Sequence, residues 1–355
     1  MNATRNRLMV MAGGTGGHVF PALAVAKLLQ SKGTDVTWLG THRGIEATVV
    51  PVNKIDMYWI TVDGLRGKGV VSWLLAPFKL LRAIIQSMRA IRQVQPDCVL
   101  GMGGFVSGPG GLAARLLGKP IVIHEQNAVA GLTNKYLAKM AKRVLTGFPQ
   151  VQGLPASAKW VGNPVRNEIV SRSDEPINEP VNVLVIGGSQ GAKSFNMHLA
   201  RVFASQNTPV GIWHQSGKGE SDEVEASYAD AGVSARVTEF IDDMSIAYDW
   251  ADLLICRAGA MTIAECCAAA KPALLIPYPF SAGDHQQINA QFMVDAGAAK
   301  MLENHQLAQP IMVSTLAELL SDKNKLKSMA AVASSLHKPN AAQDVMSACA
   351  EFFHA

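Results

Sequence analysis

A short apolar strand, a glycine-rich loop and a helix-forming stretch follow one another twice in this chain, and this repeat limits the folds open to it. The first copy runs from Leu8–Met11 into the loop Gly13–Gly17. The second runs from Val181–Ile186 into the loop Gly187–Gly191. After each copy, apolar strands continue to alternate with helical stretches, which is typical of a parallel sheet covered by helices on both faces. The sequence therefore predicts two α/β domains, each built on a doubly wound, Rossmann-like sheet.

The distance between the two copies places a domain boundary between them. At 355 residues the chain is long enough for two domains with separate cores. We expect one domain over residues 1–163, a second over 164–340, and a terminal helix over 341–355 that packs back on the first. Residues 147–163 are predicted to be loop, because prolines and glycines interrupt them. A ligand with two phosphorylated parts would lie in the cleft between two such domains.

Charge is divided unevenly between the two halves of the chain. Residues 1–163 hold 19 Lys and Arg against 6 Asp and Glu, whereas residues 164–355 hold 13 against 22. The first half therefore suits an anionic partner. Five cysteines without zinc-type spacing fit a reducing compartment. No apolar run reaches the length of a membrane-spanning helix.

The first glycine loop predicts an anion site at the start of a helix. Its glycines let backbone N–H groups approach a phosphate, and the helix N-terminus adds partial positive charge. Val19 stands where a dinucleotide fingerprint needs its last glycine, and no Lys-Ser/Thr follows as in a P-loop. We expect the helix over Ala22–Gln30, with Pro21 in its first turn. His18 is the titratable side chain at the mouth of the loop, and the simpler alternative is a tight turn with this histidine facing solvent.

Two further glycine-rich segments also follow strands. Residues 101–111 either form a second phosphate-facing loop or use their glycines only for close packing, and both interpretations stay open. Gly187–Gly191 matches the G-x-S-x-G nucleophile elbow of serine hydrolases, with Ser189 as the nucleophile and Asp242 and His285 following in triad order. We favour a phosphate loop that uses the serine hydroxyl as an extra donor, because a hydrolase leaves the first domain unexplained.

The segment Arg257–Glu265 combines a turn after a strand with a carboxylate. In one interpretation Thr262 caps a helix, and Glu265, three residues later, completes a capping box. In the other, Glu265 accepts two ribose hydroxyls while backbone N–H groups of the segment hold a phosphate. Residues 281–287 add amides suited to sugar hydroxyls. No Asp-x-Asp occurs in the chain, so the usual metal site of the other large class of sugar-nucleotide transferases is missing.

Five motifs, taken in order, resemble the MurG family of bacterial peptidoglycan glycosyltransferases over residues 7–345. They are Gly13-Gly14-Thr15-Gly16-Gly17-His18, His124-Glu125-Gln126-Asn127, Gly162-Asn163-Pro164-Val165-Arg166, Gly187-Gly188-Ser189-Gln190-Gly191 and Gly259 through Glu265. The resemblance implies an α/β protein of the GT-B fold, with its two Rossmann-like domains facing across a cleft. It implies transfer of N-acetylglucosamine from UDP-GlcNAc to the C4 hydroxyl of the N-acetylmuramyl unit of lipid I (undecaprenyl-pyrophosphoryl-MurNAc-pentapeptide). Inversion at the anomeric carbon would give lipid II for peptidoglycan synthesis.

Carried over motif by motif, the resemblance assigns contacts with UDP-GlcNAc to residues of both domains. They are Thr15, Gly16, Gly17, Asn127, Arg166, Ser189, Ile241, Ala260, Met261, Thr262, Ile263, Ala264, Glu265 and Gln287. Ile241 would meet the uracil through its backbone, Glu265 the ribose and Gln287 the sugar, with Gln286 as the alternative to Gln287. The resemblance implies no cofactor, no metal ion and no nucleic-acid partner.

Two residues compete for the role of general base on the acceptor hydroxyl. We favour His18, because an imidazole ordinarily titrates at about pH 6.5, close to neutrality. Glu125 is the alternative. The leaving UDP would be stabilised by Ser189, Arg166 and the helix N-terminus after Gly191 in place of a metal ion.

Residues 70–93 mix apolar and cationic side chains. From Pro77 onward, one helical stripe is predicted to face the core, formed by Leu81, Ile84, Ile85 and Met88. Apolar residues outside that stripe, beside several cations, suit an interfacial membrane anchor. The predicted membrane contacts are Trp73, Leu75, Phe78, Lys79 and Arg82.

The resemblance accordingly implies peripheral attachment to an anionic membrane surface, at the cytoplasmic face of the inner membrane. Other cell-wall synthesis proteins are the remaining class of partner that it suggests. Two different functions on the same fold stay open at this point. A UDP-GlcNAc 2-epimerase would keep the donor site without a lipid acceptor, and a sugar-nucleotide sensor would bind UDP-GlcNAc without releasing UDP.

Overall fold

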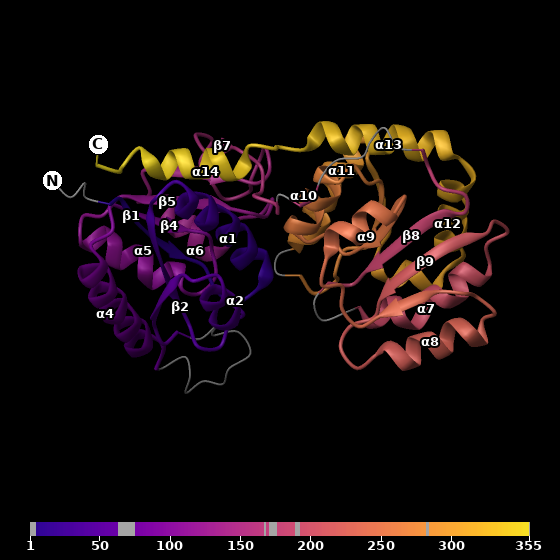
Figure 1. Ribbon diagram of the computed structural model, residues 1–355, viewed down its shortest axis with the longest axis horizontal. Coiled ribbons are helices and arrows are strands. Elements are labelled where there is room, and N and C mark those ends of the chain that lie inside the picture. The colour runs from indigo at the N-terminus through magenta and orange to yellow at the C-terminus, as the bar shows by residue number, and fades with distance from the viewer. Residues whose placement is uncertain are drawn as a thin grey trace. The chain divides into compact units, whose positions relative to one another are not determined.

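The computed structural model describes residues 5–62, 75–166, 168–169, 176–188, 192–281 and 284–354. The chain divides into two compact units. The first consists of residues 1–166 together with 338–355, and the second of residues 167–337. Figure 1 shows the elements of each unit with their labels.

A seven-stranded sheet forms the centre of the first unit, in the order β3-β2-β1-β4-β5-β6-β7. Every pairing in it is parallel. The strands are β1 (Arg7–Met11), β2 (Asp35–Gly40), β3 (Asp56–Trp59), β4 (Cys98–Gly101), β5 (Ile121–Glu125), β6 (Arg143–Thr146) and β7 (Lys159–Trp160). The chain leaves β1 and β4 toward opposite edges of the sheet. The loops that follow these two neighbouring strands therefore meet at its carboxyl edge, where doubly wound folds bind ligands.

Helices cover both faces of this sheet. They are α1 (Gly16–Ser31), α2 (Glu46–Val52), α4 (Ala76–Val94), α5 (Ser107–Leu116), α6 (Leu132–Leu137) and α14 (Ala341–Ala350). One buried cluster joins α1, α2 and α14 to the sheet through residues such as Val25, Val50 and Val345. A second cluster joins α4 and α5 to the other face through Ile91 and Ala113.

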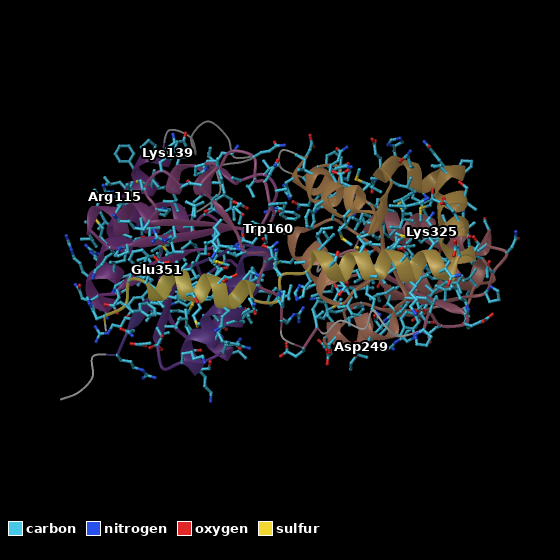
Figure 2. All side chains as sticks on the ribbon, turned by 90° about the horizontal axis from the view of Figure 1, so that it is seen from above. Arg115, Lys139, Trp160, Asp249, Lys325 and Glu351 are labelled. Carbon is cyan, nitrogen blue, oxygen red and sulfur yellow. The ribbon has the colours of Figure 1, made fainter. Side chains whose placement is uncertain are left out.

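The last helix of the chain completes the first unit. α14 packs on α1 and beside β4 and β5. It buries Val345, Ala348 and Cys349 in the cluster that it shares with α1. Just beyond it, Glu351, labelled in Figure 2, pairs with Arg143 of β6 at 2.6 Å. The unit is thus assembled from two stretches of chain that the whole second unit separates in sequence.

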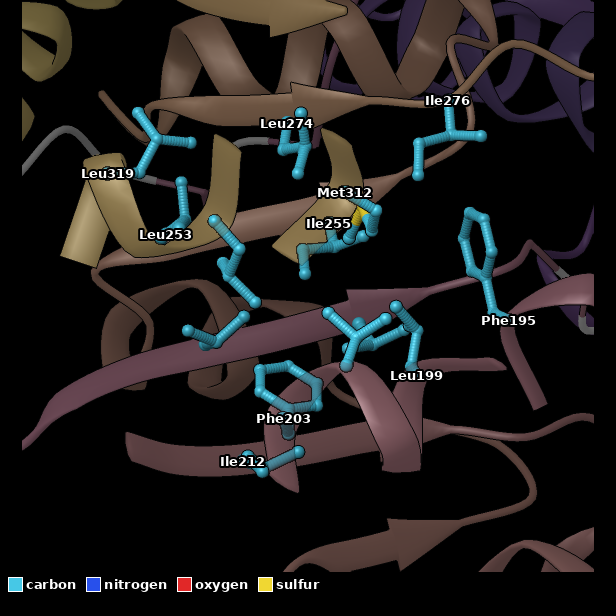
Figure 3. Close-up of a cluster of buried hydrophobic side chains, with 14 of the residues drawn as sticks. Phe195, Leu199, Phe203, Ile212, Leu253, Ile255, Leu274, Ile276, Met312 and Leu319 are labelled. Atoms are coloured by element: carbon cyan, nitrogen blue, oxygen red, sulfur yellow. The ribbon is translucent and has the colours of Figure 1, made fainter. Parts of the chain in front are cut away.

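A six-stranded parallel sheet in the order β10-β9-β8-β11-β12-β13 forms the centre of the second unit. Its strands are β8 (Val181–Ile186), β9 (Val210–Gln215), β10 (Arg236–Thr238), β11 (Leu253–Cys256), β12 (Ala273–Leu275) and β13 (Ala299–Met301). Its helices are α7 (Lys193–Ala204), α8 (Ser221–Asp230), α9 (Met244–Trp250), α10 (Ala260–Ala268), α11 (His285–Ala296), the 3-10 helix η2 (Asn304–Ala308), α12 (Pro310–Ser321) and α13 (Lys323–Leu336). Figure 3 shows part of the core, in which Phe195 and Leu199 of α7 face Ile255 of β11 and Met312 of α12.

Four elements differ from the sequence prediction for identifiable reasons. α1 begins at Gly16 rather than Ala22, so Pro21 lies inside the helix instead of in its first turn. Because Pro21 has no N–H, the carbonyl of Gly17 lacks its usual helical donor. β7 lies within residues 147–163, which were expected to be loop, and an edge strand of two residues carries too few side chains to show a period. The seven-residue helices α2 and α9 were missed for the same reason.

The face of α4 that meets the core matches the predicted one only in part. The buried residues are Ala83, Ser87, Ala90, Ile91 and Val94, with Ile84 and Met88 partly buried beside them. Leu81 and Ile85, predicted to be core, are 55% and 42% exposed. The helix packs through small residues that a hydropathy stripe does not mark. No described helix is both long and apolar enough to cross a bilayer.

Candidate functional site

The two glycine-rich segments of the first unit lie against each other at the carboxyl edge of its sheet. The N–H of Met102 donates to the carbonyl of Met11 at 2.9 Å, and the Ser107 hydroxyl lies 2.9 Å from the same carbonyl. Gly104 has a φ of +81°, and a β-carbon there would overlap the backbone of Gly13. The close-packing interpretation of the second segment is therefore confirmed at Gly104.

A buried carboxyl group that the sequence did not single out lies against the first glycine loop. Glu46, the first residue of α2, is fully buried, and its Oε2 accepts the N–H of Gly14 at 2.9 Å. Its Oε1 accepts from the backbone N–H and the hydroxyl of Thr41, at 3.1 and 2.9 Å. The Gly14 N–H is thus committed to the protein. The amides suited to an anion are those of Gly16 and Gly17, which open α1.

His18 lies in the first turn of α1 and is held through one ring nitrogen. Its Nδ1 is 3.0 Å from Oε1 of Gln126, a residue just after β5. Gln126 in turn contacts His124, whose Nε2 is 2.8 Å from the carbonyl oxygen of Gly162. A β-carbon at Gly103 would overlap the His18 ring, so glycine at this position leaves room for the imidazole. Nε2 of His18 makes no hydrogen bond to the described residues.

Glu125, the alternative base, is occupied by its own loop. The side chain is buried, and its Oε1 accepts from the backbone and side-chain amides of Asn127 at 3.0 and 3.3 Å. Its Oε2 accepts from the Gly131 N–H at 3.1 Å and from Nδ2 of Asn134 at 2.8 Å. These four hydrogen bonds organise the turn that follows β5. Asn127, one of the residues predicted to contact UDP-GlcNAc, lies in that turn.

The structure brings several predicted residues of the first unit to the N-terminal turn of α1. The guanidinium of Arg166 lies over the ring of Phe20, 5.6 Å from its centroid. That ring packs on Gly16, where a β-carbon would come within 2.9 Å of it. Thr15 is the N-cap residue, and its side chain makes no capping hydrogen bond. Two backbone amides, one hydroxyl and one cation are therefore gathered beside His18.

Arg257 organises the corresponding edge of the second unit. It follows β11, and its guanidinium donates to the Ile276 carbonyl at 3.0 Å and to the Ser194 hydroxyl at 2.8 Å. The same group lies over the ring of Phe195, 4.5 Å from the centroid. Partial burial lowers the pKa of Arg257 below its usual value, although the group stays a cation at neutral pH. Arg257 thus ties the segment after β11 to the start of α7 and to the loop after β12.

Glu265 does not belong to a capping box. α10 begins at Ala260 with Gly259 as its N-cap residue, so Thr262 lies inside the helix and caps nothing. Oε2 of Glu265 accepts the hydroxyl of Tyr248 at 2.9 Å. Burial of that phenol raises the pKa of Tyr248 well above its usual value, so the phenol stays protonated and donates. The capping interpretation is wrong, and a partly buried carboxylate at the edge of the sheet needs another explanation.

The other predicted residues of the second unit have distinct environments. Ala260 to Ala264 form the first turns of α10, and Ile241 is buried just beyond β10. Oε1 of Gln286 accepts the Tyr278 N–H at 2.8 Å, whereas Gln287 is exposed. Ser189 lies outside the described residues, so the triad that it would form with Asp242 and His285 stays a prediction.

Gln126, His124, Glu46 and Arg257 are the residues of these two edges to which the sequence analysis gave no role. The first two stand inside a motif that was recognised, and Arg257 opens another. Their contacts join residues up to 108 positions apart, so only the folded chain brings the partners together. A glutamate two positions after the glycine of Gly44-Ile45-Glu46 carries no signal of its own.

Comparison with known proteins adds the family to this geometry. Residues 8–146 match the glycosyltransferase family 28 N-terminal domain, and residues 182–345 match the glycosyltransferase family 28 C-terminal domain. The UDP-N-acetylglucosamine–N-acetylmuramyl-(pentapeptide) pyrophosphoryl-undecaprenol N-acetylglucosamine transferase of Nitrosococcus oceani is 47% identical over 352 residues, which cover 97% of this chain and 98% of the relative. The protein of the same name from Aliivibrio salmonicida is 50% identical over 337 residues, 93% of each chain.

A solved structure agrees with these relatives. The crystal structure of MurG from Acinetobacter baumannii is similar with a TM-score of 0.86 and 43% sequence identity, covering 98% of this chain and 99% of that one. Both domain models are matched in order, and both sheets have the topology that the GT-B fold requires. The chain is therefore a GT-B glycosyltransferase of family 28 and belongs to the MurG family.

Proposed function

We propose that this chain transfers N-acetylglucosamine from UDP-GlcNAc to the C4 hydroxyl of the muramyl unit of lipid I, with inversion at the anomeric carbon. One observation carries the proposal: relatives 47% and 50% identical over at least 93% of the chain bear the name of this N-acetylglucosamine transferase. The acceptor hydroxyl is the nucleophile, the bond between the anomeric carbon and the phosphate oxygen breaks, and UDP leaves. The products are lipid II and UDP.

His18 acts as the general base in this reaction. Its Nε2 is not bound by the described residues, whereas its Nδ1 is engaged by Gln126. Glu125 is poorly suited to the role, because its two oxygens already accept four hydrogen bonds from its own loop. The proton of the hydroxyl passes to Nε2 as the oxygen attacks.

Charge on the leaving pyrophosphate is balanced by groups at helix starts. In the first unit, the amides of Gly16 and Gly17, the Thr15 hydroxyl and the Arg166 guanidinium are the donors gathered beside His18. The resemblance to the MurG family assigns the same role to Ser189, which lies outside the described residues, and to the N-terminus of α7. Such donors stabilise developing negative charge most strongly when they are already in place before the reaction.

The nucleoside and the sugar are bound by the second unit. Glu265 accepts the ribose hydroxyls, since its carboxylate is partly exposed and the capping role is absent. Gln287 contacts the sugar rather than Gln286, whose Oε1 is already used by the Tyr278 N–H. Ile241 and residues 260–264 meet the uracil and the phosphates through their backbones.

Release of UDP tests the proposal. Purified protein is incubated with UDP-GlcNAc, with and without a soluble lipid I analogue, and UDP is measured by a coupled assay. We expect UDP only when the acceptor is present, and His18→Ala should abolish most of the turnover. Conversion of UDP-GlcNAc to its 2-epimer without acceptor would replace the proposal with an epimerase. Tight binding with no product would replace it with a sensor.

We also propose that α4 attaches the protein to an anionic membrane surface. Its solvent side carries exposed apolar side chains three or four positions apart, Phe78, Leu81 and Ile85, of which Phe78 is 72% exposed. Lys79 and Arg82 are exposed among them. Apolar groups that enter the interface, beside cations that meet lipid headgroups, are typical of an interfacial helix.

Leu75 stands exposed just before α4, and Trp73, also predicted to touch the membrane, lies outside the described residues. The attachment is peripheral, on the cytoplasmic face where the lipid acceptor would be presented.

Flotation with lipid vesicles tests this surface. The double variant Phe78→Ser, Ile85→Ser is compared with Met197→Ser, which alters an exposed apolar side chain on α7 of the second unit. We expect the wild type and Met197→Ser to float with vesicles that contain phosphatidylglycerol, and the double variant to stay in the dense bottom fraction of the gradient. Equal flotation of all three would contradict the assignment.

A further inference from the structure

We infer that Gln126 and His124 are positioning residues that hold His18 in the tautomer with its proton on Nδ1, so that Nε2 is always the unprotonated nitrogen. The inference rests on the proposed role of His18 as the general base. It assigns a role to two side chains that act through His18. Three hydrogen bonds connect His18 to a backbone carbonyl, and the direction of each can be derived.

The orientation of the Gln126 amide follows from its neighbours. One of its two terminal atoms lies 3.2 Å from the backbone carbonyl oxygen of His124 and 3.1 Å from the Nδ1 of that residue. A carbonyl oxygen only accepts hydrogen bonds, so this atom must be the Nε2 donor. The other atom, Oε1, is then the one that faces Nδ1 of His18 at 3.0 Å. Because Oε1 only accepts, Nδ1 of His18 must carry the proton.

His124 closes the network at its other end. Its Nε2 lies 2.8 Å from the carbonyl oxygen of Gly162, so Nε2 is protonated and donates. Its Nδ1 is then free to accept from Gln126, as the geometry requires. Burial lowers the pKa of His124 from 6.5 to about 4, because desolvation penalises the charged ring. His124 therefore stays neutral at physiological pH, and its two nitrogens keep opposite roles.

The network is fixed in place by its surroundings. His124 and Gln126 are buried, and the Nδ2 of Asn163 donates to the backbone carbonyl of Gln126 at 3.0 Å. Gly162 presents its carbonyl from a φ of +86°, a conformation that favours glycine. The charged group beside His124 is Glu125, whose oxygens are taken up by four other donors. If the Gln126 amide were rotated by 180°, its NH₂ group would face the N–H of His18 Nδ1. Its oxygen would then face the two acceptors of His124, the ring Nδ1 and the backbone carbonyl.

The consequence is a base that needs no reorganisation before it acts. An imidazole that can exchange tautomers presents a lone pair on Nε2 for only part of the time, whereas a held one presents it always. When Nε2 takes the proton of the acceptor hydroxyl, the ring becomes a cation and the Nδ1–H bond to Oε1 becomes charge-assisted and stronger. The amide oxygen of Gln126 accepts this bond without adding the permanent negative charge that a carboxylate would bring.

Three variants test the inference. Gln126→Leu removes the acceptor, and Gln126→Glu keeps an acceptor but adds a negative charge beside the ring. Gln30→Glu makes the same change near the far end of α1 and is the control. The protonated ring nitrogen of His18 is read from the ¹⁵N chemical shifts of labelled free protein. The pH dependence of kcat/KM is measured with UDP-GlcNAc and a lipid I analogue.

For Gln126→Leu we expect mixed tautomers at His18 and a fall in kcat of roughly 10²-fold or more, the scale seen when a catalytic imidazole loses its orienting partner, with KM little changed. For Gln126→Glu we expect the Nδ1–H tautomer to persist and the acid limb of the profile to move up by about one pH unit. Gln30→Glu should move neither readout. If Gln126→Leu does not fold, the displacement in Gln126→Glu still decides.

A single Nδ1–H tautomer in Gln126→Leu, or an unmoved limb in Gln126→Glu, would overturn the inference. The ¹⁵N measurement needs no substrate. If UDP-GlcNAc proves not to be used at all, the tautomer readout still stands by itself, so failure of the proposed function and failure of this inference are told apart.

Discussion

Replacing His214 by phenylalanine is expected to make the second unit more resistant to acid. His214 lies in β9 and is buried, with its Nδ1 3.0 Å from the hydroxyl of Tyr228. Its Nε2 is buried without a hydrogen-bond partner among the described residues. Burial lowers the pKa of His214 from 6.5 to about 4, because the charged ring would lose its hydration.

The size of the effect follows from proton linkage. Between pH 6.5 and pH 4 the unfolded chain binds a proton at this position and the folded chain does not, so stability falls as the pH falls. At pH 5 the unfolded histidine is almost fully protonated, which corresponds to ~2 kcal/mol of lost stability relative to pH 8. Phenylalanine keeps the ring volume and removes the titration. Its loss of the hydrogen bond to Tyr228 costs the same at both pH values.

Hydrogen exchange of the β8 and β9 amides in urea measures the stability of this unit alone. We measure the unfolding free energy of His214→Phe and of wild type at pH 8 and at pH 5. Relative to wild type, the variant should be ~2 kcal/mol more stable at pH 5 than it is at pH 8. Carboxylates titrate in both proteins and cancel. Tyr228→Phe is the matched control, because it loses the same hydrogen bond and keeps the imidazole. A difference that stays constant between the two pH values would refute the reasoning.

Three further substitutions probe other parts of the structure. Gly104→Ala should lower the urea midpoint of the first unit more than Gly118→Ala, since both residues have positive φ but only the first β-carbon overlaps backbone; equal midpoints would argue against the close packing of the two glycine segments. Phe195→Ala should destabilise the second unit by ~3–5 kcal/mol with an unchanged urea m-value, and a loss below ~1 kcal/mol would mean that the cluster in Figure 3 collapses around the gap. Glu125→Gln should lower the unfolding free energy by ~2–3 kcal/mol, because an NH₂ group then faces the N–H donors that the carboxylate accepts from. The acid limb of the pH profile of kcat/KM should stay in place. Disappearance of that limb would make Glu125 the base.

Strands could be predicted from the sequence more closely than helix starts. β8 lies where expected to the residue, because a strand buried on both faces reads as a nearly continuous apolar run. α1 starts six residues before its prediction, at Gly16. Glycine and proline there have low intrinsic helix preference, and the first turn forms nonetheless, with the His18 ring packed on Gly103.

The position of the site could be predicted, but not its internal contacts. Glycine loops after parallel strands locate the carboxyl edge of each sheet, and His18 follows such a loop in the first turn of α1. The partner of His18 comes from a distant segment, and nothing local marks Gln126 as its acceptor. Glu46 was missed for the same reason, since its bond to Gly14 spans 32 positions.

The error on α4 has a different origin. A stripe of four large apolar residues was predicted to face the core. Ile84 and Met88 do pack against it, beside Ala83 and Ala90, whereas Leu81 and Ile85 are exposed. Small residues allow α4 to approach α5 closely, and hydropathy gives them little weight. The exposed side chains of Leu81 and Ile85 instead support the membrane proposal.

Completion of the first unit by α14 has a consequence for synthesis on the ribosome. The α1 residues that pack against Val345 and Cys349 are translated before the second unit, and α14 is translated after it. Until α14 has left the ribosome, that surface of α1 stays open to chaperones and to misplaced apolar segments. A stop codon shortly before residue 341 would remove no residue proposed to touch substrate, yet it would remove one of the three helices that cover one face of the amino-terminal sheet.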